Sequence, residues 1–138
     1  MFEQCLYFNT TSLARKLERE WSAAFKPFGL TPSQAFLLRT ILTKPGSHQS
    51  DLAREMNIAT PTVSRTLDGL SRLGFIERRG SDQDARGIQI FPTDQATGIF
   101  EALNAASGNV TRKFKRLLGA GEFDDVVSRL RGISASLD

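Results

Sequence analysis

The chain has little of the chemistry on which most enzymes and metalloproteins depend. Its 138 residues include one cysteine, Cys5, and one histidine, His48. A single cysteine excludes an internal disulfide, and the two residues are too few for a zinc cluster. A catalytic thiol–histidine pair would require Cys5 and His48 to be in contact, and nothing in the sequence indicates that they are. We therefore expect a protein that is not an enzyme and needs no metal or cofactor.

Long apolar runs are absent as well. No segment approaches the ~20 apolar residues that span a bilayer, and the N-terminus lacks the basic-then-apolar order of a secretory signal. The length suits one domain that buries roughly two thirds of its unfolded surface, enough for a core without covalent staples. We expect a single folded unit, residues 1–138, that stays in the cytoplasm and has no membrane partner.

The chain has no large excess of either positive or negative charge. The net charge is +3, from 18 basic and 15 acidic side chains, which permits a polyanionic partner without requiring one. Between residues 47 and 93 the six arginines are balanced by six acidic residues. The densest basic run, 112–116, is typical of a solvated helix face. Any affinity for DNA must therefore come from where individual arginines point.

Two helices are expected in the N-terminal part. The first, about residues 6–26, is indicated by apolar residues at steps of four and three. The second begins at Thr31, where a capping threonine, Pro32 and Gln34 form a capping-box pattern, and it ends before residues 44–46. The apolar face of the first helix consists of Leu13, Leu17, Trp21, Ala24 and Phe28.

Two shorter helices follow at helix-turn-helix spacing. Ser47 is placed to cap the first of them, Asn57 suits the left-handed residue that ends it, and Ile58 is expected to plug the turn. Thr60 is placed to cap the next helix, with Pro61 at its first position. The inward residues are expected to be Leu52, Ala53 and Met56 on the first helix, and Val63, Leu67 and Leu70 on the second.

The second of these helices exposes short polar side chains suited to base edges in a major groove. It is expected to run to about Leu73, with Gly74 ending it and Phe75 folding back in a Schellman motif. The outward residues are Pro61, Thr62, Arg65, Thr66 and Asp68, with Ser64 at the boundary.

A two-stranded hairpin comes next, formed by residues 75–79 and 87–91 around the polar loop 80–86. Arg78 and Arg79 alternate faces of the first strand, so one of them can point to a backbone phosphate and the other away. A helix-turn-helix followed at once by such a hairpin is a winged helix.

The C-terminal part predicts two more helices, about 94–118 and from 123 onward, separated by residues 119–121. Together with the first helix they carry more apolar surface than a small winged domain can cover. Because symmetric pairing is the commonest way to bury such a surface, we predict a homodimer. The apolar residues are Ile99, Leu103, Ala106, Val110, Phe114 and Leu117, then Phe123, Val126, Val127, Leu130, Ile133 and Leu137.

Several short motifs occur along the chain in a fixed order. They are Leu52-Ala53, Thr62-Val63-Ser64-Arg65, the run from Leu70 to Glu77, Arg78-Arg79, and Asp84-Ala85-Arg86 ahead of Thr93. With these motifs the chain resembles the MarR family of bacterial transcriptional regulators over essentially its whole length. The resemblance implies a mostly α fold with a small β-hairpin wing: a winged helix-turn-helix lobe at 31–93, and a helical dimerisation region at 1–30 and 94–138.

The resemblance also implies a homodimer on double-stranded DNA, with each recognition helix in a major groove and each wing in the adjacent minor groove. Arg86 would then enter the minor groove, and Asp84 would brace the wing. Two positions depart from the family pattern: Pro92 should end its strand, and Ala85 stands where relatives often have another arginine. The DNA-binding set is Thr60, Pro61, Thr62, Ser64, Arg65, Arg79, Asp84 and Arg86.

The arginines also have plain structural interpretations. Arg65 could pair with Asp68 or Asp51 instead of a base, and Arg86 with an acidic residue of its own loop. A winged-helix module that binds protein without DNA is the competing function, favoured by the balanced charge. The exposed polar turn argues against it, because a protein-binding face should carry apolar anchors.

Two parts of the chain could respond to a signal that releases the DNA. Trp21, Phe25, Phe28 and Phe36 lie near the meeting of the first two helices and could hold a small aromatic or phenolic effector, although an aromatic core is the commoner arrangement. Cys5 is either a redox sensor or, as free cysteines usually are, a small buried apolar residue. His48 is expected at the surface near a helix start.

The sequence thus predicts a sequence-specific DNA-binding regulator that acts as a homodimer, and the family resemblance implies that it is a repressor. Paired recognition helices require a pseudo-palindromic operator with half-sites about 10 base pairs apart.

Overall fold

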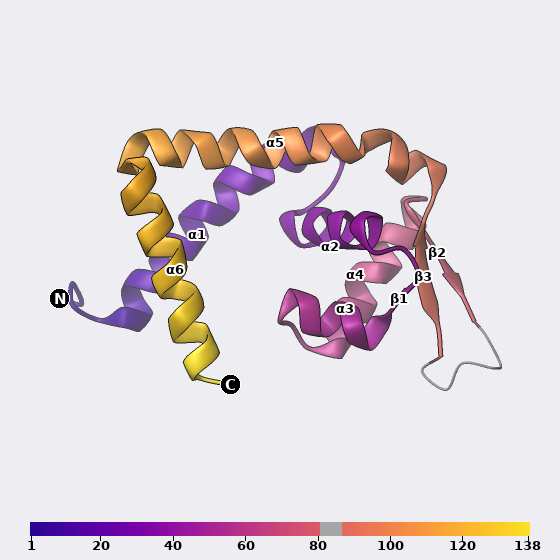
Figure 1. Ribbon diagram of the computed structural model, residues 1–138, viewed down its shortest axis with the longest axis horizontal. Coiled ribbons are helices and arrows are strands. Elements are labelled where there is room, and N and C mark those ends of the chain that lie inside the picture. Colours follow the sequence, from indigo (N-terminus) through magenta and orange to yellow (C-terminus); the bar gives the residue numbers. More distant parts are fainter. Residues whose placement is uncertain (81–86) are drawn as a thin grey trace.

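The computed structural model describes residues 1–80 and 87–138 (Figure 1). Most of this chain is helical and a small antiparallel sheet forms the wing, so the expected fold class is confirmed. The elements are α1 (Leu6–Phe25), the 3-10 turn η1 (Lys26–Phe28), α2 (Pro32–Thr43), β1 (Ser47–His48), α3 (Gln49–Met56), α4 (Thr60–Arg72), β2 (Ile76–Arg79), β3 (Gln89–Pro92), α5 (Asp94–Leu118) and α6 (Ala120–Ser136).

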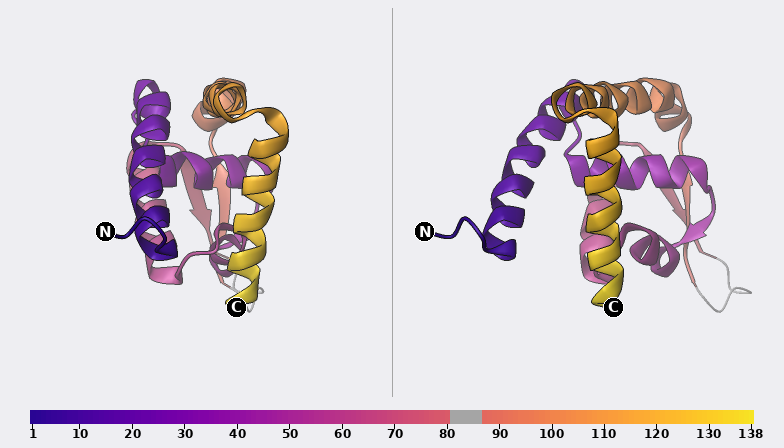
Figure 2. Two further views of the ribbon diagram at one scale, coloured as in Figure 1. Left: turned by 90° about the vertical axis from the view of Figure 1, so that its left-hand side faces the viewer. Right: turned by 60° about the vertical axis from the view of Figure 1, so that its left-hand side comes forward.

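Helix α5 connects the two parts of the molecule. In Figure 1 it runs along the top, with α2, α3, α4 and the sheet beneath one end and with α1 and α6 descending at the other. Figure 2 shows α1 and α6 as two separate arms on either side of the end of α5. Within the described residues, no helix is long and apolar enough to cross a membrane.

The apolar core lies in the lobe, where the inward faces of α2, α3 and α4 meet the sheet and one end of α5. The stripes predicted for α3 and α4 are confirmed, since Leu52, Val63, Leu67 and Leu70 are buried. Helix α1 contributes one buried residue, Phe25, while Leu13 of its predicted face is exposed. The largest fully buried side chains are Phe25, Leu37, Leu38, Ile41, Leu52, Val63, Leu67, Leu70, Ile90 and Leu103.

Local capping explains where α2 and α5 begin. In α2, the Gln34 backbone N–H donates to Thr31 Oγ1 (3.2 Å) and the Thr31 N–H donates to Gln34 Oε1 (3.0 Å), so the predicted capping box is confirmed. Thr93 caps α5, accepting a hydrogen bond from the backbone N–H of Ala96. Gly119, with φ of 86°, separates α5 from α6.

Three expectations for the N-terminal ends of α3 and α4 are wrong. Ser47 does not cap α3: it belongs to strand β1, and its hydroxyl donates to the Lys44 carbonyl. His48 occupies the N-cap position and is buried, not at the surface, because β1 pairs with β3 on the inner side of the wing. Thr60 does not cap α4 either, since Ala59 holds that position without a side-chain bond.

The turn between α3 and α4 is partly as predicted. Asn57 has φ of 55° and ends α3 in the left-handed conformation. Ile58, in contrast, is 37% exposed and so does not plug the turn.

The wing is a three-stranded sheet in the order β1-β3-β2, and not the simple hairpin that the sequence predicted. In the pairing of β2 with β3, Arg78 stands opposite Ile90 and Arg79 opposite Gln89. Strand β3 ends at Pro92 as expected, because proline has no N–H for the ladder.

Candidate nucleic-acid interface

The first two turns of α4 are open to solvent on one side. Thr60, Pro61 and Arg65 are exposed, and Thr62 and Ser64 are half-buried. These are the residues that the sequence analysis singled out on this helix. The structure brings them together on one short surface that consists of hydroxyls, a proline ring and one cation.

The Arg65 side chain makes one weak hydrogen bond. Its Nη2 donates to Thr62 Oγ1 at 3.4 Å, near the upper limit of a hydrogen bond. The predicted alternatives, pairs with Asp68 or Asp51, are wrong: Asp68 bonds Arg78, and Asp51 bonds Arg54. Because a weak bond between neighbours on one helix is easily exchanged, the guanidinium is available to another acceptor.

The C-terminal end of α4 is fixed by the Schellman motif that the sequence predicted. The N–H of Phe75 donates to the Leu70 carbonyl (3.0 Å), the N–H of Gly74 donates to Ser71, and Gly74 has φ of 81°. Thr93 Oγ1 then donates to the Gly74 carbonyl at 2.7 Å. The end of the recognition helix is therefore bonded directly to the start of α5.

The two arginines of β2 point in different directions, as their alternation predicted. Arg79 is exposed, bonds Glu77 Oε2 at 3.1 Å and lies over the Phe91 ring at 4.2 Å from its centroid. Arg78 turns inward, where its Nη2 donates to Asp68 Oδ1 (2.7 Å) and to the Ser64 carbonyl (3.3 Å). Of the two, Arg79 is the exposed one, and its phosphate contact stays a prediction.

The base of the wing is attached to the turn before α3. The N–H of Gly46 donates to the Ile90 carbonyl (2.8 Å), and Gln89 Nε2 donates to the Gly46 carbonyl (3.1 Å). With φ of 85°, Gly46 also lies against Phe91, whose ring a Cβ at this position would meet at 3.3 Å. Sequence reasoning missed this anchor, although the glycine after Lys44-Pro45 was visible as a turn.

Two predicted wing residues, Asp84 and Arg86, lie outside the described residues. Their roles, a brace for the wing and a minor-groove contact, stay predictions.

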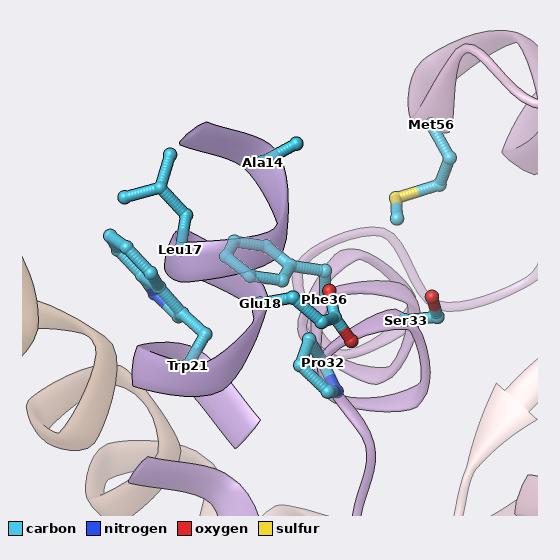
Figure 3. A pocket seen from close by; sticks show the side chains of 8 residues that line it. All are labelled: Ala14, Leu17, Glu18, Trp21, Pro32, Ser33, Phe36 and Met56. Carbon is cyan, nitrogen blue, oxygen red and sulfur yellow. The ribbon is translucent and has the colours of Figure 1, made fainter. Parts of the chain in front are cut away.

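A cavity of about 400 Å³ lies between α1 and α2 (Figure 3). Of the four aromatic residues expected there, Trp21 and Phe36 line it, Phe25 is completely buried behind it, and Phe28 packs against the core outside the lining. Figure 3 shows Leu17 and Trp21 of α1 beside Phe36, with Met56 across the opening. Two of the four predicted residues thus line a cavity, and its use as an effector pocket stays a prediction.

A cation stands beside this cavity. Arg39 lies over the Phe36 ring, 5.1 Å from its centroid, and its Nε donates to Asn104 Oδ1 at 2.7 Å. Burial lowers the pKa of the Arg39 guanidinium, which stays charged because its ordinary pKa is far above neutrality. The side chain also lines a neighbouring cavity of about 280 Å³ that shares Phe36.

Cys5 is exposed, so the expectation of a buried apolar residue is wrong. It occupies the N-cap of α1, where its Sγ accepts from the Phe8 N–H at 3.5 Å. The sensor hypothesis stays a prediction. Among the described residues there is no group of three histidine, cysteine or acidic side chains that could hold a metal ion.

The arms leave much apolar surface uncovered. No residue of α6 is buried, and the start of α1 is exposed throughout. The exposed apolar residues on these arms and at the end of α5 include Leu6, Tyr7, Phe8, Leu13, Leu117, Leu118, Val126, Val127, Leu130, Ile133 and Leu137.

Comparisons with known proteins agree with this architecture. The model of the MarR family matches residues 28–87. Two HTH-type transcriptional regulators of Bacillus subtilis, YybA and YwoH, are 29% and 30% identical over 91 residues, which is 66% of this chain. The aligned region spans 61% of YybA and 66% of YwoH, just under two thirds of each relative.

Solved structures share the fold over nearly the whole chain. The S. aureus MepR–DNA complex superposes with a TM-score of 0.88 at 22% identity, covering 99% of this chain and 100% of that one. The repressor CouR bound to a 23-mer DNA duplex gives 0.88 at 22% identity, covering 96% and 94%. A structure of CouR bound to p-coumaroyl-CoA gives 0.86 at 21% identity, again covering 96% and 94%. With its helix-turn-helix, its wing and these relatives, the chain belongs to the MarR family.

Proposed function

We propose that this protein is a sequence-specific DNA-binding transcriptional regulator that acts as a homodimer on a pseudo-palindromic operator, and that it is a repressor, as its family resemblance implies. The observation that carries the proposal is the exposed first half of α4, where Thr62, Ser64 and the lightly held Arg65 are presented together. Such a surface suits base edges, and a major groove admits an α-helix. Acting on chromosomal DNA, the protein would work in the cytoplasm.

The proposed contacts divide by groove. Thr60, Pro61, Thr62, Ser64 and Arg65 would face the major groove, and Arg79 a backbone phosphate. In the family pattern Arg86 would enter the minor groove, and Asp84 would brace the wing. Specificity would come from α4, while the arginines of the wing add affinity that depends on salt.

Dimer formation is proposed from the apolar surface of the arms. Leu130 and Ile133 of α6, with Leu6 and Tyr7 of α1, line a cavity of about 400 Å³ that is open at the surface. Large exposed apolar patches mark interaction sites, and a two-fold axis would bury the same patch on both copies. Pairing would also place two copies of α4 on one side of a duplex.

The structure offers no feature that favours the competing function, a module that binds protein without DNA. The outward residues on the first two turns of α4 include no aromatic or long aliphatic side chain, which a protein-binding face should carry. MarR-family regulators are DNA-binding proteins and not enzymes, which supports the expectation of no catalytic activity.

A small aromatic or phenolic anion is the proposed effector. The cavity lined by Trp21 and Phe36 offers an apolar wall, and Arg39 supplies a positive charge beside it. If salicylate neither raises the thermal stability of the protein nor weakens its DNA binding, this effector proposal is wrong. Trp21→Ala provides the matched variant, because it removes the wall and leaves α4 intact.

The test of the main proposal is selection of bound sequences from a random duplex pool, followed by titration of the best duplex against salt. We expect an enriched inverted repeat, and specific affinity that exceeds affinity for random duplex by roughly 10³ or more at physiological salt. Equal affinity for all duplexes, or none, would refute sequence-specific regulation.

A further inference from the structure

The ion pair between Arg78 and Asp68 joins the two elements that would enter different grooves. Arg78 lies on β2, the first strand of the wing, and Asp68 lies on the third turn of α4. The Arg78 Nη2 atom is 2.7 Å from Asp68 Oδ1 and 3.3 Å from the Ser64 carbonyl oxygen. One guanidinium therefore holds a side chain and the backbone of the recognition helix at the same time.

Burial distinguishes the arginine of this pair from its neighbour on β2, while Asp68 is 48% exposed. The Arg78 side chain is 28% exposed, against 59% for Arg79, its neighbour on the opposite face of the strand. Charge-assisted hydrogen bonds in a partly desolvated place are stronger than exposed ion pairs, which contribute little. Arg78 is therefore occupied by α4, and Arg79 is the arginine left for a phosphate.

The other attachments of the wing lie elsewhere. Gly46 and Gln89 fix β3 to the turn before α3, and the Schellman bond from Phe75 to Leu70 fixes the point where the chain leaves α4. Arg78 bonds α4 farther along β2, toward the middle of the helix. It thus adds a hydrogen-bonded contact between β2 and α4 to the packing of Ile76 in the core that the two elements share.

We propose that Arg78, braced by Asp68, is a positioning residue for DNA binding: it fixes the wing relative to the recognition helix and does not itself contact DNA. This inference rests on the proposed function. Two groups that must enter adjacent grooves together bind more tightly when their relative position is set in advance, because less conformational entropy is lost on binding. Loss of either partner of the pair should therefore weaken binding.

The test is a double-mutant cycle with Arg78→Ala, Asp68→Ala and the double variant, measured on the selected duplex at several salt concentrations. We expect each single variant to bind about tenfold more weakly, and the double variant to be no worse than the weaker single, because both changes break one pair. The slope of log affinity against log salt should stay as in the unaltered protein, since no phosphate contact is lost.

A direct phosphate contact would give the opposite pattern. Asp68→Ala would then bind as well as the unaltered protein or better, because it removes a negative charge and frees Arg78, while Arg78→Ala would lower the slope by about 0.9. Either result would overturn the proposal. Arg78→Lys tests the geometry. We expect it to resemble Arg78→Ala, because a strongly hydrated ammonium on a flexible stem does not reproduce the planar, preorganised guanidinium whose Nη2 donates to both acceptors. Binding as tight as that of the unaltered protein would refute the positioning role.

Two controls separate positioning from other effects. Arg72→Ala removes a charge from the exposed last turn of the same helix and should change affinity less than about twofold, so an equal tenfold loss would show a general charge effect and overturn the proposal. Thermal unfolding of each variant gives the folded fraction, and a loss of affinity fully explained by unfolding would also overturn it. If the unaltered protein selects no duplex, the proposed function itself fails.

Discussion

Gly69 lies on the inner side of α4, where the recognition helix approaches the start of α2. A Cβ built at this position would come 2.7 Å from Gln34 Nε2, too close for the side chain to stay in place. Gln34 is the residue whose Oε1 completes the capping box of α2 by accepting from the Thr31 N–H. Gly69→Ala should therefore act on two helices at once.

The two effects have opposite signs and similar size. Replacing glycine by alanine within a helix stabilises by about 0.5–1 kcal/mol. Displacing Gln34 would lose one capping hydrogen bond, which contributes about 0.5–1.5 kcal/mol. We therefore expect Gly69→Ala to change the free energy of unfolding by less than about 1 kcal/mol in the unaltered background. In a Gln34→Ala background, where nothing is displaced, the same change should stabilise by the full 0.5–1 kcal/mol or so.

Urea denaturation at one fixed protomer concentration measures these differences, because the stability of an oligomer depends on concentration. Gly98→Ala is the matched control: Gly98 is in α5, and no heavy atom lies within 4 Å of a Cβ built there. It should stabilise by about 0.5–1 kcal/mol in both backgrounds. Two results would contradict this account of the contact between α2 and α4. With Gln34 present, Gly69→Ala would raise the free energy of unfolding as much as the Gly98→Ala control does. In the Gln34→Ala background, Gly69→Ala would lower it by more than about 2 kcal/mol.

Three further predictions concern DNA binding and assembly. Arg65→Ala should weaken binding to the selected duplex by about 1–3 kcal/mol, with the loss concentrated at particular base pairs in a mutated-operator series, and a uniform loss would reassign Arg65 to a phosphate. Arg79→Ala should lower affinity for all duplexes alike and reduce the salt slope by about 0.9, and an unchanged slope would exclude its phosphate contact. Leu130→Glu should shift the protein toward monomers in sedimentation velocity, because pairing would desolvate a carboxylate, whereas an unaltered dimer would show that α6 lies outside the interface.

Local sequence patterns were sufficient to predict the bounds of helices whose ends carry clear capping or helix-breaking residues. The capping box at Thr31 and Gln34 and the segment between Thr93 and Gly119 gave the bounds of α2 and α5, because a cap and a break act within a few residues of each other. The Schellman end of α4 at Gly74 was predicted for the same reason.

The sequence was less informative where distant segments meet. Strand β1 consists of Ser47 and His48, and it exists because β3 pairs with it from more than forty residues away, so the local pattern there favoured a helix cap. Burial of His48 follows from that pairing. The exposure of Cys5 was missed because a free cysteine is usually buried, whereas here it begins an arm whose apolar surface is uncovered in a single copy.

The sequence predicted which side chains of the candidate site lie on the surface, but not which residues they bond. Periodicity placed Thr62 and Arg65 on the outer side of α4 with Ser64 at its boundary, and alternation separated Arg78 from Arg79. The partner of Arg78 could not be predicted, because its bond to Asp68 depends on the angle at which β2 leaves the helix. The aromatic residues near α1 were likewise divided by packing into cavity lining and core.

The most direct test of the whole account is the stoichiometry and spacing of the complex on a selected duplex, by sedimentation and hydroxyl-radical footprinting. We expect two copies of the chain on each duplex and two protected stretches whose centres lie about 10 base pairs apart, related by two-fold symmetry. One copy per duplex, or protection without that repeat, would contradict the proposal that paired recognition helices read the DNA.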